Sequence, residues 1–146
     1  MSGAPKHHRA RRLALQGLCC LDVQGARAMP TAAEFVAQSR ENPETVAEAL
    51  AMMRAAFDAQ DACDALLAGE SQHWDVQRMA LVDRNILRLA LSELLTGRTP
   101  RKVAITEAIR LAQEFSTAES ARFINGVLDA AARRVQGNEE GRDAEE

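Results

Sequence analysis

Tyrosine is absent from this sequence and tryptophan occurs once, so aromatic side chains can supply little of its core. Glycine and proline are also scarce, with eight and four residues in 146, which argues against a disordered chain. Valine and isoleucine are outnumbered by alanine and leucine, and no segment alternates as a strand does. With 47% apolar residues, the chain is predicted to form one all-α globular domain.

Long apolar runs are missing as well. No stretch reaches the roughly 18 apolar residues that a transmembrane helix needs. The first residues, Met1 to Lys6, lead into histidine and arginine rather than into an apolar segment, so we expect no secretory signal peptide. The sequence therefore predicts a cytoplasmic protein that does not enter a membrane.

The three cysteines, Cys19, Cys20 and Cys63, are odd in number and include no Cys-x-x-Cys spacing. Neither a disulfide framework nor a zinc site is predicted, and we expect reduced thiols. Gly-x-Ser-x-Gly, P-loop, Gly-x-Gly-x-x-Gly and His-x-x-x-His patterns are absent too. We therefore expect no catalytic residues, no metal ligands and no cofactor.

The segment from Val82 to Leu95 is predicted to be the central helix. It contains neither glycine nor proline, and its apolar residues form two stripes rather than one. A helix that is apolar around most of its circumference is usually buried among others. Gly97 is the expected stop signal.

The remaining helices are predicted from apolar spacing and capping signals. Gly126 lies inside a strong helical pattern, which indicates a close approach of two helices. The expected boundaries, in chain order, are a start near His8 and an end at Gly25, a capping box at Thr31 to Glu34, a start at Asn42–Pro43, a break between Asp58 and Asp61, an end at Gly69, a short piece capped by Ser71 that contains Trp74, a start after Pro100, and a second capping box at Ser116 to Glu119. We divide the chain into a flexible basic arm (1–7), one helical domain (8–136) and an acidic disordered tail (137–146).

Charge is distributed unevenly along the chain. The net charge is −3, yet residues 6–27 hold five cations and one acid, whereas residues 136–146 hold five acids and one arginine. Such asymmetry predicts a basic end that can meet phosphates. It also suggests that the acidic tail competes for the same cations.

Two segments resemble the NusB family of transcription antitermination factors. The first is Arg9-Ala-Arg-Arg-Leu-Ala-Leu-Gln-Gly-Leu18, and the second runs from Lys102-Val-Ala-Ile-Thr-Glu-Ala-Ile to Phe123-Ile-Asn-Gly-Val-Leu-Asp129. Asp83 to Leu95 fits the family's central helix. The resemblance implies about seven helices in two small packed subdomains around that helix.

The resemblance also implies a function. Members are RNA-binding adaptors that pair with NusE, a small-subunit ribosomal protein. Together they bind the boxA element, a single-stranded RNA, in nascent ribosomal RNA transcripts, and the antitermination complex helps RNA polymerase read through terminators. A chain of net charge −3 should bind RNA weakly alone, which fits a need for a basic partner.

Site residues follow from the resemblance position by position. In the RNA-binding set, Phe123 would stack on a base, although its helical period also fits a core position. In the partner set, Glu119 is equally explained as part of a capping box, and the others as ordinary charged surface. The RNA-binding set is Lys6, Arg9, Arg11, Gln16, Arg122, Phe123 and Asn125, with Arg11 expected on an exposed strip; the partner-binding set is Asp83, Arg84, Glu93 and Glu119.

Two positions differ from the family pattern. Many members carry tyrosine directly after the leucine that matches Leu18, where this chain has Cys19. Arg12 stands where the family often has glutamate. Loss of an aromatic platform and gain of a cation both bear on base preference more than on binding itself.

Two other functions stay open. One is a helical protein-interaction module that does not bind RNA, which the negative net charge favours slightly. The other is the RNA-binding domain of a truncated ribosomal RNA methyltransferase, which would need a further α/β domain. A homodimer is a third possibility for the partner surface.

Overall fold

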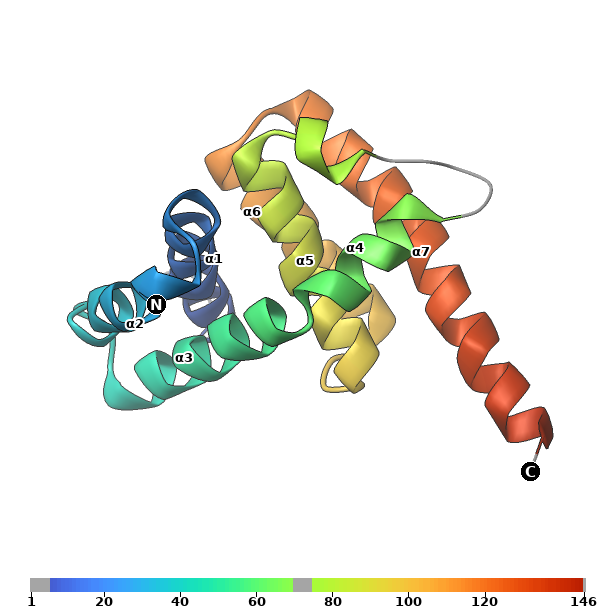
Figure 1. Cartoon of the computed structure of the whole chain (residues 1–146), viewed down its shortest axis with the longest axis horizontal. Helices are drawn as coiled ribbons and strands as arrows, with labels where there is room; N and C mark the ends of the chain where they lie inside the picture. The colour runs from blue at the N-terminus through green and yellow to red at the C-terminus, as the bar shows by residue number, and fades with distance from the viewer. Residues whose placement is uncertain (1–5, 70–74, 146) are drawn as a thin grey trace. The chain divides into compact units, whose positions relative to one another are not determined.

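The computed structural model describes residues 6–69 and 75–145, and for 136–145 only the backbone. The described residues form seven α-helices and two short 3₁₀ helices, and they contain no strand (Figure 1). The predicted all-α class is confirmed. The short helical piece expected at Ser71 to Trp74 lies outside the described residues, as do residues 1–5 of the predicted arm. Lys6 and His7, which were assigned to that arm, are the first residues of helix α1.

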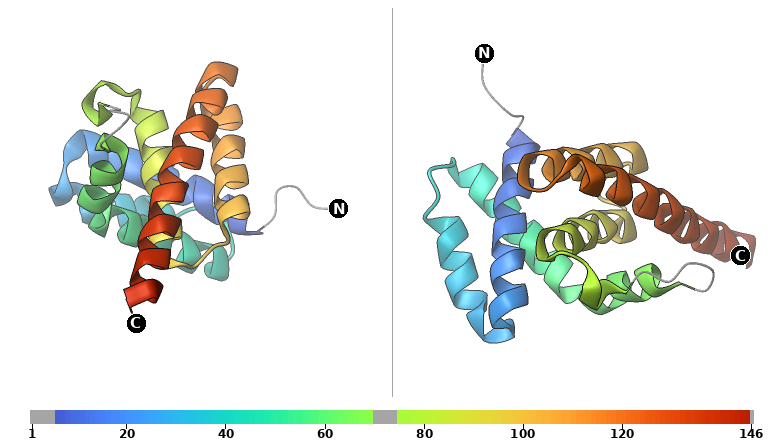
Figure 2. Two further views of the ribbon diagram at one scale, coloured as in Figure 1. Left: turned by 90° about the vertical axis from the view of Figure 1, so that its right-hand side faces the viewer. Right: turned by 90° about the horizontal axis from the view of Figure 1, so that it is seen from above.

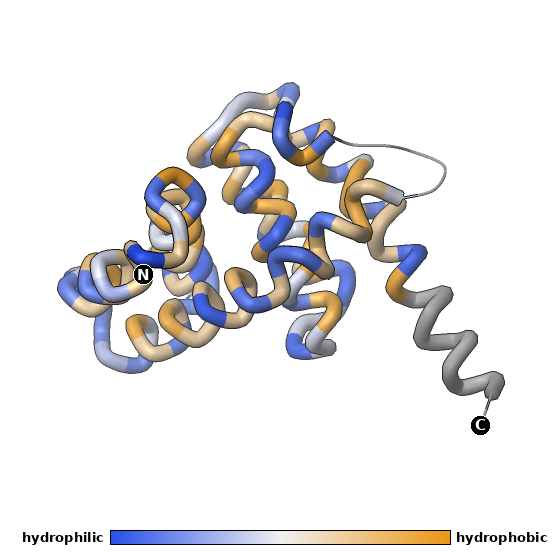
Figure 3. The backbone as a smooth tube through the Cα atoms, in the orientation of Figure 1, coloured by the Kyte–Doolittle hydropathy of each residue, from blue (hydrophilic) through white to orange (hydrophobic). Residues whose placement is uncertain are grey.

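The chain divides into two compact units, Met1–Asp58 and Ala59–Glu146. The division falls where helix α3 (Pro43–Asp58) ends and helix α4 (Gln60–Ala68) begins, which is the predicted break. Within each helix the colour in Figure 3 alternates between hydrophilic and hydrophobic residues, as expected for helices with one buried face. No described helix is long and apolar enough to cross a membrane.

In the first unit, α1 (Lys6–Gln24) packs against both α2 (Met29–Ala37) and α3, as the views in Figure 2 show. The predicted apolar stripe of α1, from Ala10 to Leu21, is buried. The 3₁₀ helix η1 (Ala26–Ala28) joins α1 to α2. Asn42 caps α3 as predicted, because its Oδ1 accepts a hydrogen bond from the Thr45 backbone N–H at 2.8 Å.

Gly17 lies where α1 packs closely against Met53 of α3. A Cβ atom at this position would overlap the Sδ atom of Met53, whose side chain is fully buried. The close approach that the sequence placed at Gly126 is wrong. Gly126 is exposed on helix α7 (Ala118–Glu145), and a Cβ atom there would meet nothing within 4 Å.

The capping box predicted at Thr31 is also wrong. Helix α2 begins two residues earlier, at Met29, with Pro30 in its first turn and no side-chain cap. Proline fits the first turn of a helix because its missing N–H has no partner to lose there. The 3₁₀ helix η1 ends directly before Met29, so the chain is already helical when it reaches Thr31.

In the second unit, α5 (Leu81–Thr96) contacts α4, α6 (Arg101–Phe115) and α7. It is buried almost continuously from Asp83 to Leu94, which confirms the predicted central helix. Gly97 ends it with φ 68°, a left-handed conformation that glycine adopts without cost. The 3₁₀ helix η2 (Val76–Arg78) precedes α5 and is capped by Asp75.

Arginine side chains of α5 and α7 form hydrogen bonds with α4. Arg88 of α5 donates two hydrogen bonds of 2.9 Å to the carboxylate of Asp64 on α4, and its side chain is 4% exposed. Arg134 of α7 donates to the carbonyl oxygen of Leu66 at 2.7 Å, near the C-terminal end of α4. Paired in this way, Arg88 avoids the large penalty of an unpaired buried charge.

The turn between α6 and α7 is capped one residue later than predicted. The Thr117 hydroxyl accepts a hydrogen bond from the Ser120 backbone N–H at 3.0 Å, so Thr117, and not Ser116, is the N-cap of α7. At its other end, α7 continues to Glu145, past Gly137. The two glycines of this stretch, Gly137 and Gly141, each cost a helix about 1 kcal/mol, and the glutamates and arginine around them favour the helix. The separate acidic tail stays a prediction.

Substituting Gly17 and Gly126 with alanine should change stability in opposite directions. Gly17→Ala should lower the free energy of unfolding by about 1–3 kcal/mol, because the new methyl overlaps buried Met53. Gly126→Ala should raise it by about 0.5–1 kcal/mol, because alanine favours the helix and meets open space. Urea denaturation measures both. Equal effects at the two sites would contradict the assigned contact.

Cys63 should resist alkylation. Its side chain is fully buried on α4 and its thiol donates to the Arg88 carbonyl at 3.6 Å. Burial, with a smaller contribution from the Asp64 charge, raises the pKa of Cys63 to about 12. Treated with iodoacetamide at pH 8, Cys19 and Cys20, which are partly exposed, should be modified while Cys63 is protected until the protein unfolds. Peptide mass spectrometry checks this. Labelling of Cys63 at the rate of Cys19 under native conditions would contradict it.

Candidate nucleic-acid interface

The N-terminal end of α1 presents the first group of predicted RNA-binding cations. Lys6 and Arg9 lie three residues apart, so they share one side of the helix. Each is paired with an acid of the same unit. Lys6 Nζ lies 2.6 Å from Oε2 of Glu44, and Arg9 Nε lies 3.0 Å from Oε1 of Glu41.

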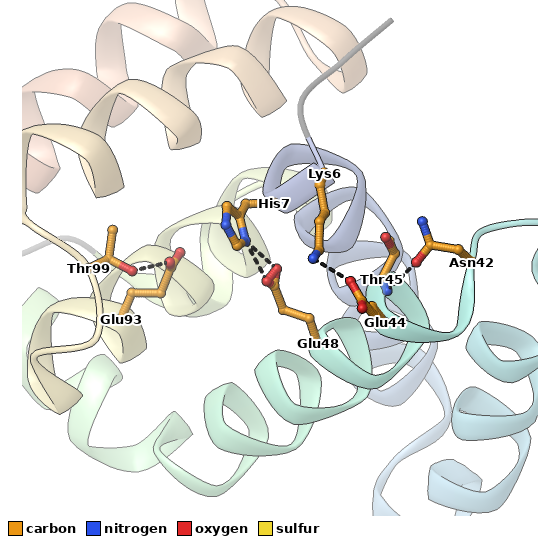
Figure 4. A network of polar contacts seen from close by, with 8 residues as sticks. All are labelled: Lys6, His7, Asn42, Glu44, Thr45, Glu48, Glu93 and Thr99. Atoms are coloured by element: carbon orange, nitrogen blue, oxygen red, sulfur yellow. Dashed lines mark hydrogen bonds and ion pairs between the residues drawn. The ribbon is translucent and has the colours of Figure 1, made fainter. Parts of the chain in front are cut away.

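His7 completes this group. Its Nδ1 atom lies 2.6 Å from both carboxylate oxygens of Glu48 on α3, and Figure 4 shows this contact beside the Lys6–Glu44 pair. The hydrogen bond from Lys6, and then its charge, lower the pKa of the Glu44 carboxyl; the same contacts raise the pKa of Lys6. The positive end predicted from the sequence is therefore partly neutralised by α3.

Arg11 and Gln16 differ sharply in exposure. Arg11 is 5% exposed, so the predicted exposed position is wrong. It lies two residues after Arg9 and therefore on a different side of α1, which it shares with the buried Ala14 and Leu15. Gln16 is exposed as expected. An RNA contact by Arg11 remains a prediction that would require its side chain to become accessible.

The start of α7 presents the second group. Ile124, Val127 and Leu128 fill the buried side of this helix, whereas Arg122, Phe123 and Asn125 are exposed. Phe123 is 38% exposed, so the core position that its helical period also allowed is excluded. A half-exposed phenyl ring can stack on a base, and the exposed cation and amide of the same helix can donate hydrogen bonds.

The predicted partner-binding residues divide into two kinds. Asp83 is 7% exposed, and its two carboxylate oxygens accept hydrogen bonds of 2.9 Å from the hydroxyls of Ser116 and Ser120. Glu93 is 6% exposed and accepts from the Thr99 hydroxyl at 2.7 Å, as Figure 4 shows. Neither is the charged surface residue that the sequence suggested.

Arg84 and Glu119 are the more accessible members of the partner set. Arg84 is half-buried on α5, whereas Glu119 is exposed in the first turn of α7. A carboxylate in that turn is favoured by the helix dipole, which accounts for Glu119 without a partner. Contact of either residue with a partner remains a prediction.

Sequence reasoning missed the acids that pair with α1. Glu44 and Glu48 are four residues apart, which places them along one side of a helix starting near Asn42, and Glu41 directly precedes that helix. The sequence therefore allowed their position to be predicted. It did not allow their partners to be predicted, because only the packing of α1 on α3 decides which cations they face.

The described residues contain no group of three histidine, cysteine or acidic side chains that could hold a metal ion. What they present is a helical scaffold with paired cations on one helix and an exposed aromatic flanked by polar side chains on another. This is the surface chemistry of a helical nucleic-acid-binding adaptor.

The comparisons with known proteins agree with that class. Residues 8–133 match the model of the NusB family, and the chain belongs to this family. It is 36% identical over 138 residues to the transcription antitermination protein NusB of Symbiobacterium thermophilum, covering 88% of this chain and 90% of that protein.

Solved structures show the same fold. NusB of T. maritima superimposes with a TM-score of 0.77 at 28% sequence identity, covering 90% of this chain and 93% of the other. A chain from the crystal structure of the antitermination factors NusB and NusE in complex with dsRNA superimposes with a TM-score of 0.78. The match covers 88% of this chain and 97% of that one at 22% identity, so it speaks for the fold alone.

Removing the Asp83 carboxylate should destabilise the protein. Asp83→Ala leaves the Ser116 and Ser120 hydroxyls without their charged acceptor, and we expect the free energy of unfolding to fall by about 2–4 kcal/mol. Asp61→Ala, which removes an exposed acid from the first turn of α4, should cost less than about 1 kcal/mol. Denaturant titration of both variants measures these two losses in the free energy of unfolding. A loss at position 83 no larger than at position 61 would refute the structural role.

Proposed function

We propose that this protein is a transcription antitermination factor that binds boxA-type RNA together with NusE, the small-subunit ribosomal protein. The exposed Phe123, on a helix turn that also exposes Arg122 and Asn125, is the observation that carries the proposal. Phe123 is 38% exposed, which leaves part of its phenyl ring accessible for stacking on an unpaired base.

Cations on both units support the proposal. Lys6, Arg9 and Arg122 can each neutralise an RNA phosphate. Three contacts with a single strand would give a salt dependence with a slope of about −2. A slope this shallow means modest affinity for RNA alone, because phosphate contacts supply most of the binding free energy at low salt.

A basic partner would correct this weakness. The chain carries a net charge of −3, so a basic ribosomal protein bound beside it would add positive charge and further RNA contacts. The NusB relative solved with NusE and dsRNA supports such an arrangement. We place Arg84 and Glu119, the accessible members of the partner set, at that surface.

We propose further that the protein acts by binding, without catalysis, in the bacterial cytoplasm. There it would join the RNA polymerase antitermination complex through its RNA and its partner. The family membership and the bacterial relatives named as antitermination proteins support this. Self-association through the partner surface is an alternative state that NusE would displace.

A protein-interaction module that does not bind RNA is the second candidate. The pairing of Lys6 and Arg9 with glutamates favours it, because those cations already have anionic partners. The measurement that separates the two candidates is RNA affinity itself.

Fluorescence anisotropy with a labelled 12-nucleotide boxA-type RNA, with and without NusE, tests the proposal. Tight binding is expected only with both proteins. Phe123→Ala should weaken RNA binding by about 5- to 150-fold, the loss expected when a stacked base leaves an aromatic ring. The fold should be unaffected, because the ring is half-exposed.

Phe35→Ala is the matched control. Phe35 is an exposed phenylalanine on α2, 51% exposed, that belongs to neither predicted set. Its substitution should change RNA affinity by less than about twofold. RNA binding that is equally insensitive to both substitutions, or absent with NusE present, would rule out the proposed interface.

A further inference from the structure

Three carboxylates of the first unit contact polar side chains in the first turn of α1. Glu44 contacts Lys6, Glu48 contacts His7, and Glu41 contacts Arg9, at distances of 2.6 to 3.0 Å. We refer to Glu41, Glu44 and Glu48 as the acidic strip. Figure 4 shows two of its members reaching from α3 toward α1.

We propose that the acidic strip is an intramolecular competitor of RNA, which occupies the cations of α1 until RNA phosphates displace it. This rests on the proposed function, in which Lys6 and Arg9 contact RNA. The strip thereby lowers affinity for any RNA that offers phosphates alone.

The chemistry of the two anions supports the competition. Carboxylate and phosphate both present oxygen atoms to ammonium and guanidinium donors at the same distances. Arg9 uses its Nε atom for Glu41, an atom that it would also use to grip a phosphate. A cation held in this way has to exchange one anion for the other.

The exposure of the pairs makes the exchange feasible. Side-chain exposure is 46% for Lys6 and 76% for Glu44, so both groups are largely solvated. Exposed ion pairs of this kind shift an equilibrium by a factor of about five at most. RNA can therefore displace the strip, but each displacement reduces the observed affinity.

Competition has a consequence for selectivity. An RNA that binds through phosphates alone gains little, because each new contact replaces an existing ion pair. An RNA that also stacks on Phe123, or that contacts a bound partner protein, gains free energy that the strip does not oppose. Glu44 and Glu41, which face Lys6 and Arg9, would thus help to exclude nonspecific RNA.

Glu44→Gln tests the proposal directly, because glutamine keeps the shape and removes the charge. Affinity for labelled 12-nucleotide boxA-type RNA, with NusE present, should rise by about two- to fivefold. The salt slope should become more negative by up to about 0.7, the increment for one additional phosphate neutralised on a single strand. Adding Glu41→Gln, which removes the carboxylate charge that faces Arg9, should not reduce the gain.

Glu34→Gln is the matched control. Glu34 is an exposed glutamate of the same unit, on α2, and it accepts a hydrogen bond from the neutral side chain of Gln38. The Glu34→Gln substitution removes one negative charge, as Glu44→Gln does, but it leaves the ion pairs of α1 in place. Its effect on RNA affinity measures the general influence of net charge.

A double-mutant cycle with Lys6→Ala separates the outcomes. The proposal expects Lys6→Ala to weaken binding and to abolish the gain from Glu44→Gln. If Glu44→Gln still raised RNA affinity in the Lys6→Ala background, or if Glu34→Gln raised it equally, the effect would be one of net charge. Either result would overturn the competition. No gain, with Lys6→Ala still weakening binding, would overturn the competition and leave the proposed function intact. No loss from Lys6→Ala would remove the RNA contact on which the competition rests and overturn it, whereas the proposed function is tested separately by Phe123→Ala.

Discussion

Pairing of buried polar groups is the constraint on which the second unit depends. Its central helix carries Asp83 and Arg88 into the interior, and each needs a partner from another element. Ser116 and Ser120 hold both oxygens of Asp83, which fixes the turn between α6 and α7 against α5. Asp64 holds Arg88 in a two-bonded pair, which fixes α4. Because an unpaired charge in the interior costs several kcal/mol, arrangements of these helices that leave either group unpaired are strongly disfavoured.

The ion pairs of the first unit follow the same chemistry with a different outcome. Arg88 is 4% exposed and its pair is structural, whereas Lys6 is 46% exposed and its pair with Glu44 is solvated. Water screens the second pair and reduces its contribution to a small fraction of the first. A buried pair thus positions helices, while an exposed pair is weak enough to be exchanged for an RNA phosphate. The proposed function uses the exchangeable kind.

Helix α7 combines a structural and a functional side on successive residues. Ile124 and Leu128 are fully buried, so the helix is held firmly along that side. Phe123 lies one residue before Ile124 and is turned by about 100°, which brings it to the surface. Binding groups placed on a well-packed helix lose little freedom on binding, which favours a preorganised stacking surface over a mobile one.

The sequence by itself determined the helical class, the central helix with its stop at Gly97, the cap at Asn42 and the family, because these depend on local propensity and on apolar periodicity. It did not determine exposure at single positions. Periodicity alone favoured a core position for Phe123 and a surface position for Arg11, whereas Phe123 is 38% exposed, as the family resemblance implied, and Arg11 is buried. Likewise, only tertiary packing decided that Asp83 faces two serines and that Lys6 faces Glu44. The position of a charged residue in the sequence does not specify which helix will pack against it.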